Sequence, residues 1–179
     1  MDTALGITLL GTELVLIVFV LFAIVRTGFM RLDSSAGIWR DGLPPGKAAP
    51  LWSIPDLAGH LRVTPAGDHW QFLIFTNHSL VSFPDLILGI HHLAQAVQEL
   101  EVLVLTRGDR EYCESIVRGL SLQVPVVPVD QALYDRYLVR VMPFATLLDP
   151  QGITRWVGLV NTEAQLFHIW RMIRATVTV

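Results

Sequence analysis

The sequence has little charge and almost no cysteine. Asp, Glu, Lys and Arg make up 16% of it, against about 25% in a typical soluble domain, while 52% of the residues are hydrophobic. Disorder needs low hydrophobicity and high net charge, so this composition excludes a disordered chain. The formal net charge of -3 provides no electrostatic basis for nucleic-acid binding. The single cysteine, Cys113, excludes an internal disulfide framework and a cluster of thiolate metal ligands.

Much of the apolar excess lies near the N-terminus, where Glu13 is the only ionisable side chain between Leu5 and Val25. A helix over these residues spans roughly 31 Å, about the thickness of a bilayer's hydrocarbon core. A cleaved signal peptide needs a basic region in front and a small-residue cleavage site, and no Lys or Arg precedes Arg26. Residues 1–31 are therefore predicted to form a single transmembrane anchor, in contact with the lipid bilayer.

Glu13 is an unusual residue for such a helix. A carboxylate at membrane depth costs at least a few kcal/mol unless it is neutralised or paired. Glu13 shares one helical face with Gly6, and a small and a polar residue on one face suit packing against another transmembrane helix. Alternatively, the span shifts to about residues 14–30 and the carboxylate reaches the headgroups. The pattern leaves both interpretations open.

The rest of the chain divides into a linker and a domain. Residues 32–50 are turn-rich and lack periodicity, which is typical of a linker. Residues 51–179 are numerous enough for one compact domain with its own core. Their hydrophobic periodicity predicts an α/β sandwich with a mixed sheet. The expected strands are 70–76, 101–106, 124–129, 144–149 and 153–159, and the expected helices are 82–100, 109–120, 130–138 and 162–175.

Several local strings occur in a fixed order along the chain. They are Gly46-x-x-Ala49-Pro50, residues 54–59, Met142-Pro143-Phe144, the turn 149–152 and residues 158–161. With the anchor, they resemble membrane-anchored thioredoxin-like proteins of the MauD and TlpA type over nearly the whole chain. The resemblance implies a thioredoxin-like fold, a cis-proline at Pro143 and a domain outside the cytoplasm. The basic residues from Arg26 to Lys47 favour the cytoplasmic side instead, so the sidedness stays open.

The turn after the first core strand departs from that family. The resemblance implies Cys-x-x-Cys at the start of the long helix, and here Ser79 and Ser82 stand at those positions. A serine hydroxyl cannot form a disulfide, so thiol–disulfide exchange at this turn is lost. Cys113 is expected in the middle of another helix as an inert structural residue. The long helix is expected to take Ser79 or Ser82 as its N-cap, with Pro84 in its first turn.

No other constellation of catalytic or metal-binding residues is evident. His78 precedes Ser79 directly and no orienting carboxylate is near, which argues against a hydrolase. His91 and His92 point about 100° apart and lack the i, i+4 spacing of a metal pair. The sequence therefore predicts no catalytic residue, no metal and no cofactor. The remaining histidines fall in different elements, with nothing in the sequence to link them: His60, His69 and His168.

These observations predict a non-catalytic accessory or structural subunit of a membrane protein complex. Its redox-inactive thioredoxin-like domain binds partner subunits, because the family docks an extended chain beside the proline loop. One alternative is a maturation factor that binds a client, as the MauD resemblance implies, and another is an active thiol–disulfide oxidoreductase. The candidate partner-binding residues are Gly6 and Glu13 in the anchor, and Leu80, Val81 and Met142 beside the proline loop.

Overall fold

The computed structural model describes residues 41–177, without the side chains of His78, Ser79 and Val177, and these residues belong to one compact unit. The expected anchor, with Gly6 and Glu13, lies outside the described residues. Among the helices from residue 41 onward, none is both long enough and apolar enough to cross a membrane.

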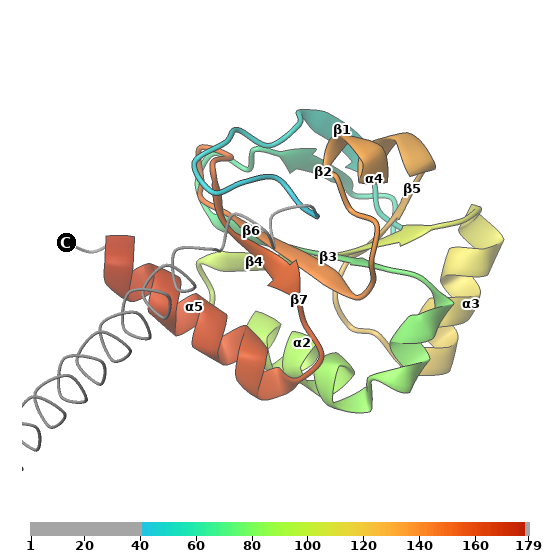
Figure 1. The fold of residues 1–179 in the computed structure, drawn as a ribbon. Helices are drawn as coiled ribbons and strands as arrows, with labels where there is room; N and C mark the ends of the chain where they lie inside the picture. Colours follow the sequence, from blue (N-terminus) through green and yellow to red (C-terminus); the bar gives the residue numbers. More distant parts are fainter. Residues whose placement is uncertain (1–40, 178–179) are drawn as a thin grey trace, which may run out of the picture. The chain divides into compact units, whose positions relative to one another are not determined.

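Five strands form a mixed central sheet in the order β5-β4-β3-β6-β7 (Figure 1). β3 is parallel to β4, and β4 to β5, whereas β6 is antiparallel to both β3 and β7. All seven residues of β3 are buried, as expected of a strand with parallel pairing and layers on both faces. The strands are β3 (Trp70–Thr76), β4 (Leu100–Arg107), β5 (Val126–Val129), β6 (Phe144–Leu148) and β7 (Thr154–Leu159).

Helices cover the sheet on both faces, which confirms the expected α/β sandwich. α2 (Pro84–Ala96) and α5 (Glu163–Val177) lie side by side on one face, and α4 (Gln131–Arg136) lies on the other (Figure 1). α3 (Arg110–Leu120) packs near β5. The main hydrophobic core lies between β3 and the helices α2 and α5, and it includes Phe72, Ile74, Leu86, Ile90, Leu166 and Trp170.

A two-stranded hairpin, absent from the sequence prediction, precedes the central sheet. β1 (Trp52–Pro55) pairs antiparallel with β2 (Leu61–Thr64) on the same face as α4 (Figure 1). The Trp52 indole N–H donates to the Tyr137 hydroxyl at 3.0 Å. The Thr64 hydroxyl donates to the side-chain oxygen of Gln71 in β3 at 3.1 Å. These buried contacts attach the hairpin to the domain.

The starts of α5 and α2 differ in their capping, and the N-cap predicted for α2 is wrong. At α5, the Thr162 hydroxyl accepts from the Gln165 N–H at 3.3 Å, and the Gln165 side chain accepts from the Thr162 N–H, as in a capping box. At α2, the N-cap is Phe83 and makes no side-chain cap bond, so neither serine caps the helix. A short 3-10 helix, η2 (His78–Ser82), takes up the residues expected to start α2. Pro84 then opens α2, because its fixed φ suits the first helical position.

Residues 41–50, expected as the end of the linker, make backbone hydrogen bonds with the β6–β7 hairpin. The Gly46 N–H donates to the Thr154 carbonyl at 2.7 Å, and the Thr154 N–H donates to the Lys47 carbonyl at 2.8 Å. The Ala49 N–H donates to the Gly152 carbonyl at 2.8 Å. This segment therefore covers the start of the outer edge of β7.

The close approach of α2 and α5 predicts a large effect of a single methyl group at Gly89. A Cβ there would lie 2.5 Å from the Glu163 Cα atom, so Gly89→Ala is expected to lower the free energy of unfolding by about 1–3 kcal/mol. Gly119→Ala in α3 is the matched control, because its Cβ would meet nothing within 4 Å. The control is expected to gain up to about 1 kcal/mol. Denaturant unfolding measures both variants, and equal midpoints would contradict this packing.

Candidate functional site

The turn that carries the two serines lies next to the loop that carries Pro143, at one end of the sheet. β3 ends at Thr76 and leads into η2, while Phe144 at the start of β6 pairs with Phe75. The chain after β3 and the chain before β6 therefore lie next to each other. The peptide bond Met142–Pro143 is cis. The bond Thr64–Pro65, at the end of β2, is also cis and was not expected.

The side chains around this turn divide between core and surface. Leu80 is fully buried in the hydrophobic core, which removes it from the candidate binding surface. Val81 is 63% exposed, Val141 is exposed, and Met142 is partly exposed. Within the described part of the chain, the backbone of Val141 and Met142 makes no hydrogen bond. The surface therefore offers apolar side chains and open main-chain groups beside Pro143.

Two buried tyrosines support the end of β3 from beneath. The Tyr134 hydroxyl donates to the Thr76 carbonyl at 2.6 Å. The Phe75 ring lies 5.2 Å from the Tyr134 ring and 5.0 Å from the Tyr137 ring, measured between centroids. Burial raises the pKa of Tyr137 to about 12 and also raises the pKa of Tyr134. Both hydroxyls therefore stay protonated at neutral pH, and they act as structural donors and acceptors.

Cys113 lies in α3 and is fully buried. Its Sγ atom is 3.9 Å from the Thr106 carbonyl oxygen. Burial raises the pKa of the thiol, and the nearby Asp109 carboxylate raises it further. The thiolate, rather than the thiol, is the nucleophile in disulfide exchange, so this covered and protonated group is poorly suited to that reaction.

A second cluster of polar side chains surrounds Asp56, which is 2% exposed. Its carboxylate accepts from the Arg62 Nε atom at 2.9 Å and from the His60 backbone N–H at 2.9 Å. Burial alone would raise the pKa of Asp56, but the hydrogen bonds from Arg62 and His60 and their charges outweigh it and lower the pKa. Arg62 also donates from Nη1 to Glu101 in β4 at 2.9 Å.

Glu101 extends this cluster to another histidine. Its Oε2 atom lies 3.2 Å from the His69 Nε2 atom and accepts from the Gln71 side-chain amide at 2.9 Å. His60 reaches the same cluster, with its Nδ1 atom 3.8 Å from Asp56. The expectation that nothing links His60 and His69 is therefore wrong. They belong to separate elements that the hairpin brings together, and no short-range spacing in the sequence indicates it.

His91 and His92 connect α2 to different neighbours. His91 accepts the Gln123 backbone N–H at 3.1 Å, and burial, with a smaller effect of His92, lowers its pKa. His92 lies 2.8 Å from the Glu163 carboxylate. In the part of the chain that the structure describes, no group of three His, Cys, Asp or Glu side chains could hold a metal ion.

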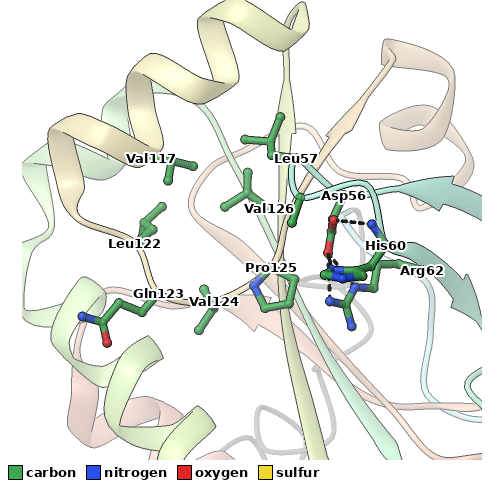
Figure 2. Close-up of a pocket in the computed structure, with 11 residues that line it drawn as sticks. Asp56, Leu57, His60, Arg62, Val117, Leu122, Gln123, Val124, Pro125 and Val126 are labelled. Atoms are coloured by element: carbon green, nitrogen blue, oxygen red, sulfur yellow. Dashed lines mark hydrogen bonds and ion pairs between the residues drawn. The ribbon is translucent and has the colours of Figure 1, made fainter.

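An open pocket of about 430 Å³ lies beside the Asp56 cluster (Figure 2). Its walls come from the loop after β1, from the last turns of α3 and from the segment that enters β5. No sequence pattern indicates this pocket, because its wall residues are spread from position 56 to position 126.

Comparison with known proteins identifies the fold. No protein-family model and no curated protein matches the chain. The thioredoxin domain of a thiol-disulfide oxidoreductase from Bacteroides vulgatus has a TM-score of 0.62 at 12% identity, over 73% of this chain and 99% of that one. A candidate thiol:disulfide interchange protein DsbE from Chlorobium tepidum has 0.65 at 15%, over 74% and 97%. A thiol-disulfide oxidoreductase from Bacteroides fragilis has 0.60 at 18%, over 70% and 99%.

The chain therefore has the thioredoxin-like α/β fold found in thiol-disulfide oxidoreductases, as the sequence resemblance implies. At identities of 12–18%, the likeness concerns the fold. The activity depends on the residues at the turn, where the chain carries Ser79 and Ser82.

The lowered pKa of Asp56 predicts a pH-dependent stability. An ionised Asp56 stabilises the fold above its ordinary pKa of 3.8, and this contribution is lost as the pH falls through the lower value in the folded state. At pH 7, Asp56→Asn is expected to cost roughly 2–3 kcal/mol, less than a fully buried pair because Arg62 is partly exposed. Below about pH 4 the difference from the wild type is expected to shrink.

Urea denaturation between pH 3 and pH 7 measures this effect. Glu111→Gln, the same kind of change at an exposed carboxylate of α3, is the matched control and is expected to change stability by less than about 0.5 kcal/mol. A constant difference between Asp56→Asn and the wild type across this range would contradict the assignment.

Proposed function

We propose that this protein is a redox-inactive, thioredoxin-like accessory subunit of a membrane protein complex. The observation that carries the proposal is that Ser79 and Ser82 stand on a thioredoxin-like fold at the turn where the resemblance implies two cysteines. Dithiol exchange requires two thiols, and the one cysteine of the chain is buried in α3. A binding role needs the fold but not the thiols.

The surface beside Pro143 supports a binding role. Val81 and Val141 expose apolar side chains there, and Met142 is partly exposed. An extended segment of a partner can pair with the open main chain of residues 141 and 142 and place its side chains against this apolar surface. Such pairing gives affinity through the backbone, so it does not depend on chemistry at the turn.

The resemblance to MauD- and TlpA-type proteins supports the membrane location. We propose that residues 1–31 anchor the protein by a single span, with Glu13 contacting a partner helix, and that the domain lies outside the cytoplasm. The MauD resemblance also supports a second candidate function, in which the same surface binds a client during maturation. The two functions differ in whether the protein remains in the finished complex.

The loss of redox activity is tested by restoring the thiols. The wild-type chain is expected to give no turnover in an insulin-reduction assay, because neither serine supplies a thiolate. The double variant Ser79→Cys, Ser82→Cys in a Cys113→Ser background is expected to form a disulfide and to gain turnover. Ser79→Cys alone is the control and lacks the resolving thiol. Turnover by the wild type that disappears in Cys113→Ala would overturn the proposal.

The subunit role is tested by stoichiometry after extraction in mild detergent. The full chain is expected to copurify with its complex at a fixed ratio, and Val81→Asp is expected to weaken this association at least about tenfold, or by about 1.4 kcal/mol. Leu61→Asp is the matched control, because Leu61 is 64% exposed and Val81 is 63% exposed. Elution of the wild type alone as a monomer would contradict the subunit role. Association only with unfinished complexes would favour the maturation role.

A further inference from the structure

The pocket of Figure 2 belongs to a different part of the sheet from the proposed partner surface. The partner surface lies at the start of β6, whereas the pocket lies along β5, at the edge of the sheet. Its volume of about 430 Å³ falls within the range of about 300–1,000 Å³ that is usual for small-molecule sites. What it could bind follows from the chemistry of its two walls.

One wall is apolar. Val117 of α3 and Leu122, Val124 and Val126 of the segment entering β5 line it, and all four contribute to the hydrophobic core. Figure 2 shows Val117 and Leu122 on the side away from Asp56, His60 and Arg62. This wall is continuous with the core and gives a rigid surface for the apolar body of a ligand.

The opposite wall is polar and has spare hydrogen-bond donors. The Arg62 guanidinium carries five N–H groups. Its Nε atom donates to Asp56 at 2.9 Å and Nη1 donates to Glu101 at 2.9 Å. Nη2 forms an ion pair with the same Asp56 oxygen at 2.8 Å and uses a third N–H group there. Two N–H groups therefore have no acceptor among the described residues. The exposed His60 imidazole stands beside them at the rim.

The charges around the pocket disfavour an anion as the acceptor. Two carboxylates, Asp56 and Glu101, surround the single guanidinium of Arg62. α3 also ends at Leu120, close in sequence to wall residues, and the carboxyl end of a helix carries partial negative charge. A neutral oxygen can accept from Arg62 without the repulsion that a carboxylate or phosphate would meet.

The edge of β5 is closed to an added peptide strand. The Leu57 N–H already donates to the outward carbonyl of Val126 at 2.9 Å. Pro128, two residues further on in β5, has no N–H to offer on this side, and proline on an edge strand blocks pairing. The pocket therefore suits a small molecule better than an extended chain.

We propose that this pocket binds an uncharged, mostly apolar small molecule whose carbonyl oxygen accepts hydrogen bonds from Arg62. The apolar body packs on Val117, Leu122 and Val126, and the carbonyl meets the spare N–H groups. The proposal is independent of the proposed accessory function, because neither Ser79, Ser82 nor the proline loop contributes to the pocket.

Three probes of similar size test the chemistry: acetophenone, benzoate and ethylbenzene. The full chain is reconstituted in nanodiscs with methyl-labelled Val and Leu, and each probe is titrated by NMR. Acetophenone is expected to shift the methyl signals of Val117, Leu122, Val124 and Val126 in a saturable way. Benzoate and ethylbenzene are each expected to bind at least about tenfold more weakly, since one carries a charge and the other lacks the acceptor.

Two variants that fill the pocket without touching the Asp56 cluster locate the site. Ala58→Trp and Gln123→Trp replace exposed residues of the rim and are each expected to reduce acetophenone binding at least about tenfold. Ala132→Trp, at an exposed alanine of α4, is the matched control and is expected to bind like the wild type. The proposal is overturned if acetophenone causes no saturable shift, or if benzoate binds as tightly as acetophenone. It is also overturned if every rim variant that remains folded binds acetophenone like the wild type.

Discussion

The complete burial of β3 is the constraint on which the other elements depend. β3 pairs with β4 on one side and, from Gln71 to Phe75, with β6 on the other. Side chains of successive residues point to opposite faces of the sheet. Phe72 packs in the core with α2 and α5, while Phe75 contacts the tyrosines beneath the opposite layer. The end of β3 is therefore fixed from both faces, and with it the start of the turn that carries Ser79 and Ser82.

Gln71 is a buried polar residue of this strand, and its hydrogen bonds connect the core to the pocket. Its side chain is fully buried and accepts from Thr64, while its amide nitrogen donates to the Val63 carbonyl and to Glu101. Glu101 in turn holds Arg62. A buried amide costs free energy wherever a hydrogen bond is missing, so this arrangement allows little choice of geometry. The position of Arg62 at the pocket is set from within the core.

The parts that could be predicted from sequence are those with long, regular patterns. The strand 70–76 is β3 itself, and the helix expected at 109–120 begins one residue later as α3, because Asp109 is its N-cap. The β1–β2 hairpin has no clear signal, because its strands have four residues each and alternate weakly. The cluster around Asp56 has none either, because Arg62 and Glu101 are 39 positions apart. The turn after β3 follows from the strand pattern, but the burial of Leu80 depends on the 3-10 helix, which has no clear sequence signal.

Two hairpins of the domain are closed by the same arrangement of residues. Asp56 accepts the N–H of the residue four positions later and pairs with Arg62, six positions later. Asp149 likewise accepts the N–H four positions later, at 2.8 Å, and pairs with Arg155 at 2.6 Å. Each carboxylate requires a loop of fixed length, because one inserted or deleted residue would displace the N–H or the guanidinium that it binds. Insertions and deletions in natural variants should therefore be rare in these two turns and more common in loops that no carboxylate closes in this way.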